Sequence, residues 1–290
     1  MNALEFRNVH FAWNGGGAEA VEVLQGMSFS IEKRHLVCIL GPSGCGKSTV
    51  MQLAAGLERP DSGEVLSQGQ AVAGPPSDRG LICQKPKLFP WCTAIANVEW
   101  GLRMRGVGRA ERRRIAKEML ANVGLSDWAH RRVQELSGGM QQRVAIARTL
   151  ANDPDLMLMD EPYAGLDVQT RLLMQRFLLS TWAQTGKTVV MVTHDIDEAL
   201  IADRVIVLSR RPARILEDLA VDLPRPREVH CPEFARLRAR LSRLIEREVM
   251  ADASETGGWE AAVDAPAVWK TNGLEGEEQH QQARSEGEVP

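Results

Sequence analysis

The sequence predicts an α/β fold with a mostly parallel central sheet. A short continuous apolar run, Leu36–Leu40, is followed by a stretch of helical character, and this combination is typical of a buried parallel strand with its helix. After Pro154, apolar runs and helical stretches alternate again as far as Leu208. Strands that alternate with helices indicate a parallel sheet covered by helices.

Two more strands, one helix and one short strand are predicted in the N-terminal part of the chain. Strands are expected over Leu4–Trp13 and Met27–Ile31, and a helix over Lys47–Leu57. Residues 58–79 are polar and rich in Gly and Pro, which predicts loops, and Leu81–Cys83 predicts a short strand.

The middle of the chain is predicted to be mainly helical. Residues 84–152 carry this character, most clearly over Ala110–Val123. The region is also basic, with Arg103, Arg105, Arg109, Arg112, Arg113 and Arg114. Two interpretations stay open at this point: a solvated helical face, or a docking surface for a partner.

The second half of the chain shows the strand–helix alternation in full. Strands are expected over Leu156–Met159, Thr188–Val192 and Arg204–Leu208. Helices are expected between them, over Val168–Gln184 and Ile196–Ile201. This order places polar residues after several strand ends, which is where ligands gather in parallel sheets.

The C-terminal part changes in composition from Leu223 onward. One amphipathic helix is predicted from apolar residues at helical spacing, namely Phe234, Leu237, Leu241, Leu244, Ile245 and Val249. The last residues, 251–290, are net acidic and have too little apolar content to pack, which predicts disorder. We therefore expect a main domain over 1–222, a helical extension over 223–250 and a tail over 251–290.

Composition narrows the class of partner. The 290 residues are 44% hydrophobic and 25% charged, which is ordinary for a globular protein. The formal net charge of −3 gives no reason to expect nucleic acid as a partner. No stretch approaches the ~18 apolar residues that a membrane span needs, so we expect any membrane role to depend on a partner.

A phosphate-binding loop follows the buried run Leu36–Leu40. Its residues match G-x-x-x-x-G-K-[ST] and are Gly41, Pro42, Ser43, Gly44, Cys45, Gly46, Lys47, Ser48 and Thr49. The glycines let successive backbone N–H groups turn toward phosphate oxygens, and the helix start adds its positive dipole end. Lys47 is expected to bind the β- and γ-phosphates, and Ser48 to ligate Mg²⁺.

Two carboxylates end the strand Leu156–Met159. Asp160 is placed to hold Mg²⁺, directly or through water. Glu161 points elsewhere, so its carboxylate is free to act as a general base on the attacking water. The alternative is a solvent-exposed pair at a strand end, which the preceding phosphate loop disfavours.

A second potential anion site lies at Leu136–Arg143. Ser137, Gly138 and Gly139 can present backbone N–H groups at a helix start, although one nucleotide does not need two phosphate cradles. The stretch resembles the LSGGQ signature of the ATPase subunits of ABC transporters, with Met140 in place of the usual Gln. The resemblance covers about residues 3–222. It implies that the signature of one subunit completes the nucleotide site of its partner in a homodimer.

Other motifs follow in the order of the same family. Gln84 resembles the Q-loop glutamine, which contacts Mg²⁺ and senses the transmembrane partner, and Asp167 lies in a stretch that resembles the D-loop, which reaches across the dimer. His194 resembles the switch histidine at the γ-phosphate, the alternative being a surface histidine that caps a helix. Trp13 occupies the place of the aromatic that stacks on adenine, with a core tryptophan as the alternative.

The resemblance implies an ABC-type P-loop NTPase fold. Such a fold has a mostly parallel core sheet, an N-terminal antiparallel β part and an inserted helical subdomain, here about residues 86–152. It also implies ATP hydrolysis with Mg²⁺, with Lys47, Glu161 and His194 as catalytic residues. The competing function is that of a soluble ABC ATPase without a transporter.

Finer matches point to the importers of nitrate, sulfonate and taurine. They lie at Leu88–Thr93, Leu166–Arg171, Leu208–Pro212 and Leu223–Arg227. This group implies permease subunits in the membrane, a periplasmic or lipid-anchored solute-binding protein, and a peripheral location on the cytoplasmic face of the inner membrane. We expect the imported solute to be a small organic or inorganic anion.

Overall fold

The computed structural model describes residues 1–13, 20–75 and 78–256. Met1–Val249 form one compact unit, and a second unit begins at Met250. The described part of the second unit is the end of a helix. Most of the tail for which disorder is predicted, residues 257–290, lies outside the described residues, whereas the helix itself continues to Thr256.

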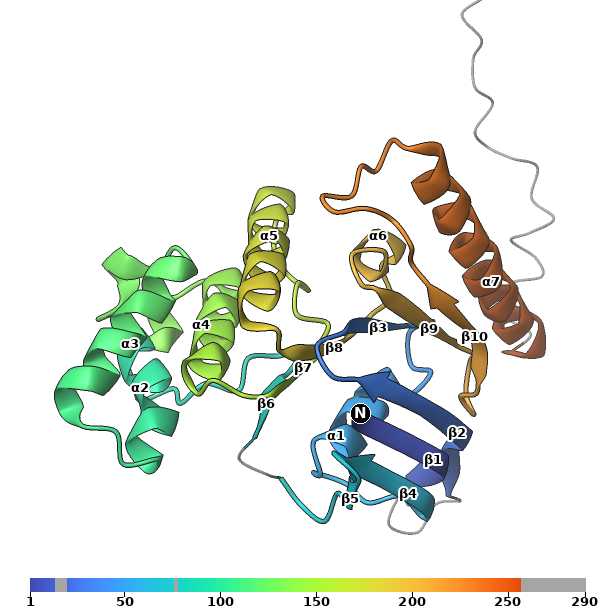
Figure 1. Cartoon of the computed structure of the whole chain (residues 1–290), viewed down its shortest axis with the longest axis horizontal. Helices are drawn as coiled ribbons and strands as arrows, with labels where there is room; N and C mark the ends of the chain where they lie inside the picture. Colours follow the sequence, from blue (N-terminus) through green and yellow to red (C-terminus); the bar gives the residue numbers. More distant parts are fainter. Residues whose placement is uncertain (14–19, 76–77, 257–290) are drawn as a thin grey trace, which may run out of the picture. The chain divides into compact units, whose positions relative to one another are not determined.

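The first sheet is antiparallel and has the strand order β2-β1-β4-β5 (Figure 1). Its strands are β1 (Asn2–Trp13), β2 (Val21–Glu32), β4 (Ser62–Ser67) and β5 (Gln70–Ala71). The polar, Gly- and Pro-rich composition of residues 58–79 predicted no strand where β4 and β5 lie. Ser62, Gly63 and Glu64 of β4 are exposed, so this edge region lacks the apolar pattern that identifies a strand.

The second sheet has the order β10-β9-β3-β8-β7-β6. Its strands are β3 (Leu36–Leu40), β6 (Arg79–Ile82), β7 (Leu156–Asp160), β8 (Thr188–Thr193), β9 (Arg204–Leu208) and β10 (Ile215–Ala220). All neighbouring strands pair in parallel except β10, which runs antiparallel to β9. The predicted fold class, with a mostly parallel sheet and an antiparallel N-terminal part, is thus confirmed. The strand β10 was not predicted.

Two hydrophobic cores cover the two faces of this sheet. Along β3, Leu36, Cys38 and Leu40 belong to one core, while Val37 and Ile39 belong to the other, because successive strand residues point to opposite faces. The second core is shared with the antiparallel sheet and with α1 (Lys47–Ala54). Helix α1 therefore lies between the two sheets, with the phosphate loop at its N-terminus.

The helical region between β6 and β7 contains α2 (Ala94–Met104), α3 (Arg109–Asn122) and α4 (Gly138–Ala151), which pack on one another. Its arginines pair locally: Arg113 binds Glu99, and Arg114 binds Glu111 and Glu118. These pairs favour the solvated-face interpretation for α3. Only Ala116 and Leu120 of that helix are buried.

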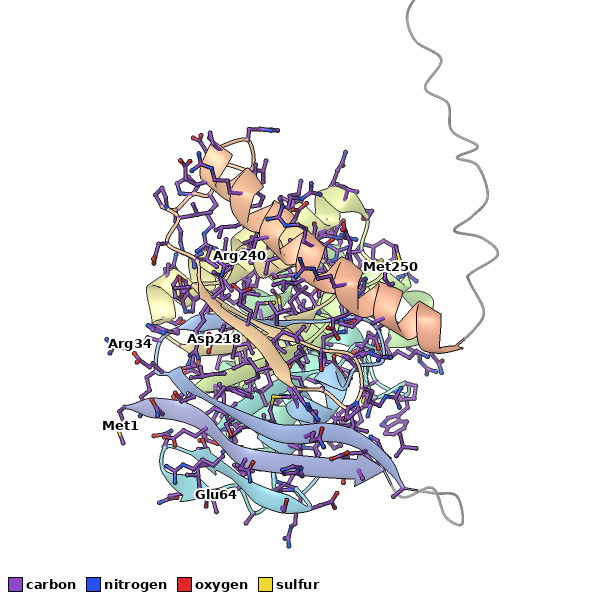
Figure 2. All side chains as sticks on the ribbon, turned by 90° about the vertical axis from the view of Figure 1, so that its right-hand side faces the viewer. Met1, Arg34, Glu64, Asp218, Arg240 and Met250 are labelled. Atoms are coloured by element: carbon purple, nitrogen blue, oxygen red, sulfur yellow. The ribbon has the colours of Figure 1, made fainter. Side chains whose placement is uncertain are left out.

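The remaining helices are α5 (Val168–Thr185), α6 (Ile196–Ala199) and α7 (Pro232–Thr256). Helix α7 lies across β10, where Arg240 and Asp218 are labelled in Figure 2. Its Phe234 and Leu241 are buried in the core on the helical face of the parallel sheet, and its Arg240 pairs with Glu217 of β10. Arg238 pairs with Asp197 of α6 at 2.7 Å. The C-terminal helix is thus joined to the segment that follows β8.

Candidate active site

A cleft of about 410 Å³ opens at the carboxyl ends of the parallel strands. Most of its lining residues follow β3, β6, β7, β8 and β9. The predicted site residues that line it are Trp13, Ser43, Gly44, Gly46, Lys47, Ser48, Thr49, Gln84, Glu161 and His194. The structure therefore brings together side chains that are up to 181 positions apart (194 − 13).

The phosphate loop has backbone angles that require glycine. Gly44 and Gly46 have φ values of 76° and 120°, in the left-handed region that side chains disfavour. A Cβ atom at Gly46 would also come within 2.8 Å of Val23 Cγ1. The loop is thus held close against β2, and its shape depends on both glycines.

Lys47 is buried at the base of the cleft. Its Nζ atom donates hydrogen bonds to the carbonyl oxygens of Gly41 and Pro42, each at 2.8 Å, and the residue is only 5% exposed. An ammonium group has three donors, so one N–H remains for a phosphate oxygen. Gly41, Pro42 and Cys45, which were also predicted to bind the nucleotide, are not among the residues that line the cleft.

Ser48 and Asp160 form the predicted metal pair. The Ser48 hydroxyl donates to Asp160 Oδ1 at 3.1 Å. Burial raises the pKa of the Asp160 carboxyl, the hydrogen bond from Ser48 opposes this, and the charge of Glu161 adds to it. One carboxylate and one hydroxyl are hard oxygen ligands, which fits Mg²⁺, an ion that proteins commonly hold with one or two carboxylates plus substrate phosphates.

Glu161 follows the end of β7 and contacts residues that follow the ends of β6 and β8. Gln84 Nε2 donates to Glu161 Oε2 at 2.9 Å, and His194 Nδ1 lies 3.1 Å from Glu161 Oε1. The Glu161 side chain is 14% exposed, whereas that of His194 is 57% exposed. Glu161 also has a φ of 45°, and strained non-glycine backbone of this kind clusters at functional sites.

The residues on both sides of His194 are held by hydrogen bonds. Thr193 Oγ1 donates to the buried carboxylate of Glu198 at 2.7 Å, and Asp195 caps α6 by accepting from the N–H groups of Asp197 and Glu198. Burial raises the pKa of Glu198, and the bond from Thr193 lowers it. Arg171 of α5 lies 3.7 Å from Glu198. The histidine is thus attached to a rigid network.

Trp13 stands at the end of β1, where the cleft opens. It is 41% exposed, and its ring meets Phe11 edge-on with centroids 4.9 Å apart. An exposed ring face on the wall of a cleft is available for stacking. The alternative of a core tryptophan is therefore disfavoured.

The predicted signature residues lie elsewhere. Ser137 caps α4, its Oγ accepting from the N–H of Met140 at 3.3 Å. Neither Ser137, Gly138, Gly139 nor Asp167 is among the residues that line the cleft. Asp167 caps α5, and the hydrogen bond from Thr170 lowers the pKa of its carboxyl. Gly139 lies beside Leu166, since a Cβ there would come within 3.1 Å of Leu166 Cδ2.

The sequence analysis did not assign two of the lining residues, Val23 and Arg211. Arg211 Nε donates to the carbonyl oxygen of Gly44 at 3.0 Å. The only sequence signal for Arg211 was its place in the stretch Leu208–Pro212. That stretch pointed to the importer group but did not indicate what Arg211 does.

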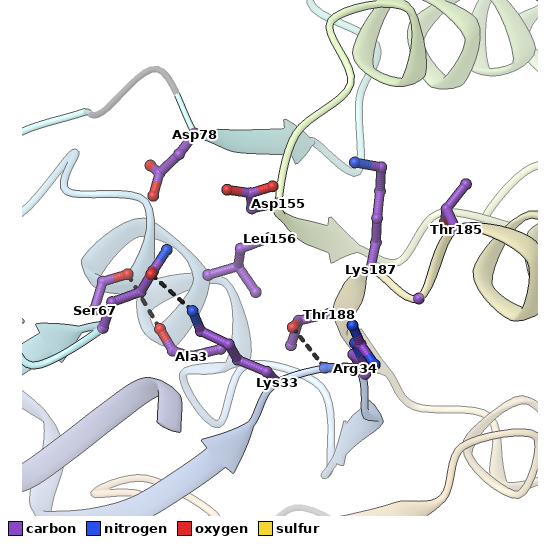
Figure 3. A pocket seen from close by; sticks show the side chains of 12 residues that line it. Ala3, Lys33, Arg34, Ser67, Asp78, Asp155, Leu156, Thr185, Lys187 and Thr188 are labelled. Atoms are coloured by element: carbon purple, nitrogen blue, oxygen red, sulfur yellow. Dashed lines mark hydrogen bonds between the residues drawn. The ribbon is translucent and has the colours of Figure 1, made fainter. Parts of the chain in front are cut away.

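A second hollow of about 220 Å³ lies at the opposite ends of the strands (Figure 3). Both lysines that line it bond to neighbours, Lys33 to Gln68 at 2.9 Å and Lys187 to Asp153 at 2.8 Å, and the hollow contains none of the predicted site residues. The cleft at the phosphate loop is therefore the better candidate for the active site.

A phosphate-loop motif after one strand and a carboxylate at the end of another are typical of P-loop nucleotide hydrolases. A family model described as "ABC transporter" matches residues 24–164. An uncharacterized ABC transporter ATP-binding protein of Methanocaldococcus jannaschii is 45% identical over 241 residues, which is 83% of this chain and 89% of that protein. The chain belongs to the ABC transporter ATP-binding family, as the resemblance predicted.

Other relatives and solved structures agree with this. Taurine import ATP-binding proteins are 40% identical in Roseobacter denitrificans (86% of this chain, 97% of that protein) and 44% identical in Pseudomonas aeruginosa (76% and 87%). A structure of the ATP-binding cassette MJ0796, described as a dimer in a post-hydrolysis state bound to ADP and Pi, superposes with a TM-score of 0.70. It is 33% identical and covers 75% of this chain and 98% of that chain. The chain is an ABC-type ATPase, and its relatives include ATP-binding proteins of taurine import.

Among the helices that the structure describes, none is long and apolar enough to cross a bilayer.

Proposed function

We propose that this chain energises a bacterial importer of a small anion, such as taurine, another sulfonate or nitrate, by hydrolysing MgATP. The observation that carries the proposal is the junction of Gln84, Glu161 and His194 beside the phosphate loop. This junction joins the residue that the family uses to sense a permease to the proposed general base. The taurine import relatives support the choice of solute class.

The predicted site residues have separate roles in the binding and hydrolysis of ATP. The remaining N–H of Lys47 and the backbone N–H groups of the loop bind the β- and γ-phosphates. Ser48, Asp160 and Gln84 would hold Mg²⁺, which would supply positive charge to offset that of the phosphates. Glu161 takes a proton from the attacking water, and His194 contacts the γ-phosphate. Trp13 stacks on the adenine base.

We propose that two copies act as a homodimer. Support comes from the signature residues Ser137–Gly139, which lie outside the cleft of their own chain, and from the similar cassettes, which are described as dimeric. In the dimer, the signature of each copy binds the nucleotide held by the phosphate loop of the other. The closed state is then stabilised by ATP, because the shared contacts exist only there.

The membrane partner is proposed to be a permease, served by a periplasmic or lipid-anchored binding protein, with the ATPase on the cytoplasmic face of the inner membrane. An aromatic cluster after Gln84 offers a contact surface: Phe89 packs on Trp100 with centroids 4.6 Å apart, and Trp91 is 70% exposed. A large exposed aromatic suits a protein interface.

Uptake measurements test this function. A strain that lacks the gene would be complemented with the wild type, with Lys47→Ala or with Arg214→Ala, and assayed for labelled taurine, an alkanesulfonate and nitrate. We expect wild type and Arg214→Ala to restore uptake of at least one anion, and Lys47→Ala to fail. Arg214 is the control because its guanidinium bonds to Gln25 and does not line the cleft. Unchanged uptake of all three anions in the deletion strain would favour a soluble ABC ATPase.

A further inference from the structure

Arg211 is a cation in the nucleotide cleft to which the functions described so far assign no role. It lies in the loop between β9 and β10, far from the phosphate loop in sequence, yet its Nε atom donates to Gly44 O at 3.0 Å. A Cβ at Gly44 would come within 3.5 Å of Arg211 Nη2. The guanidinium group thus lies against the turn of the loop whose N–H groups face the phosphates.

The loop that carries Arg211 is held from two sides. On one side, the N–H of Ala213 donates to Val23 O at 2.7 Å, and the N–H of Gln25 donates to Ala213 O at 3.1 Å. On the other side, Glu248 of α7 accepts a hydrogen bond from the N–H of Arg210 at 2.8 Å. The backbone on either side of Arg211 is therefore fixed before any ligand binds, which lowers the entropic cost of binding through it.

The charge of Arg211 has no partner within the part of the chain that the structure describes. A guanidinium group has five N–H donors, and only the bond to Gly44 O occupies one of them in these residues. No carboxylate of the described residues lies within ion-pair distance of it. By contrast, Arg204 on the neighbouring strand is paired with Asp218. An unpaired cation on the wall of a phosphate cleft is suited to bind an anion.

We propose that Arg211 binds the phosphates that ATP and ADP have in common. This assignment rests on the proposed nucleotide site and adds a second full positive charge to that of Lys47. The position at Gly44 favours these phosphates over the γ-phosphate, because the water-activating junction is formed by Gln84, Glu161 and His194, none of which bonds to Arg211. It also favours a phosphate over the base, because Arg's forked donors match phosphate oxygens.

The test compares four variants by equilibrium binding of ADP and adenosine without Mg²⁺, using the full chain. We expect Arg211→Ala to weaken ADP binding about ten-fold or more, as expected for loss of a charge-assisted hydrogen bond, and to leave adenosine binding unchanged. Arg211→Lys should keep most of the affinity and Arg211→Gln should not. Arg214→Ala, in the same loop but outside the cleft, should bind ADP as the wild type does.

Several outcomes would overturn the assignment. Wild-type ADP affinity in Arg211→Ala excludes a phosphate contact, and an equal loss of ADP and adenosine indicates stacking on the base. Recovery by Arg211→Gln but not by Arg211→Lys indicates that only the bond to Gly44 matters. Lys47→Ala separates this failure from that of the proposed function: if Lys47→Ala loses ADP while Arg211→Ala does not, only the role of Arg211 fails. If neither loses it, the nucleotide site itself is misplaced.

Discussion

The nucleotide cleft and the signature region of the same chain differ in how their polar groups are used. In the cleft, the proposed functional side chains bond to one another: Ser48 to Asp160, and Gln84 and His194 to Glu161. Around the signature residues Ser137–Gly139, and counting only residues that the structure describes, the side chain of Ser137 bonds only to the start of its own helix and a Cβ at Gly138 would meet no atom within 4 Å.

The difference indicates what each region requires. The cleft is preorganised, so one copy of the chain is expected to bind nucleotide by itself. The signature region presents a helix N-terminus, with its positive dipole end, toward open space. A second copy can bring a phosphate to that point. Changes in the cleft should therefore affect chemistry within one chain, while changes at the signature should affect only the assembled pair.

The largest effect is expected from Glu161→Gln, which removes the general base and keeps a side chain of similar shape. We expect ATP hydrolysis to fall by about 10²–10⁴-fold, while ATP binding remains and a dimer accumulates. Phosphate release and size-exclusion chromatography with ATP measure the two effects. Glu118→Gln is the control, because Glu118 pairs with Arg114 on the surface of α3. Near-normal turnover in Glu161→Gln would exclude Glu161 as the base.

A more selective change is Gly138→Asp, which separates the two regions. The position has room for a side chain, and an acidic residue in the first turn of a helix is favourable, so the fold should be kept. We expect ADP binding by one chain to be unchanged. ATPase activity should fall about a hundred-fold, because like charges placed together across an interface cost several kcal/mol.

Gly138→Ser is the matched control for this prediction, since it fills the same space without charge. Its ATPase activity should stay much closer to that of the wild type. If Gly138→Asp hydrolyses ATP normally, the signature does not contact the nucleotide of a second copy. If it loses ADP binding as a monomer, the signature belongs to the cleft of its own chain.

The sequence predicted correctly the strands that are buried on both faces, because such strands are continuous apolar runs. The strands β3, β7 and β8 are continuous apolar runs because helices or the other sheet cover both faces. Strand β10 was missed because only alternate residues are half-buried and because it contains Glu217 and Asp218. Those charges are paired with Arg240 and Arg204, which are contacts that a local pattern does not reveal.

Motifs and the order of strands were enough to predict which residues form most of the candidate site. The phosphate loop and the residues that follow β6, β7 and β8 converge because the carboxyl ends of parallel strands share one edge. Arg211 could not be assigned, since its contact with Gly44 joins residues 167 positions apart and depends on side-chain packing. The spacing of residues in the sequence likewise did not reveal the contacts of the Glu161 carboxylate with Gln84 and His194.

Asp160→Asn tests whether the preorganised cleft lowers the stability of the fold. Because burial raises the pKa of Asp160 in the folded chain, folding favours the protonated form of this carboxyl group. The associated stability is present below the unfolded pKa, about 3.9, and is lost as pH rises through the folded value. At neutral pH the ionised carboxylate is therefore destabilising. We expect Asp160→Asn to raise the Tm by about 2 °C near neutral pH, and the gain to vanish below about pH 4.

Asp167→Asn, at a helix cap outside the cleft, is expected to change the Tm in the opposite direction and to have the smallest effect. The hydrogen bond from Thr170 lowers the pKa of Asp167, so its stabilising contribution is present above the unfolded pKa and is lost as pH falls through the folded value. Asparagine also caps helices well, so we expect only a slight fall in Tm at neutral pH and none in acid. Thermal unfolding of both variants without nucleotide or Mg²⁺ across this pH range measures the contrast.

If both substitutions shift the Tm in the same direction at neutral pH, the electrostatic difference between the two regions does not exist. If they shift it in opposite directions, Asp160 is retained for its chemistry at the expense of stability, while Asp167 stabilises its own helix.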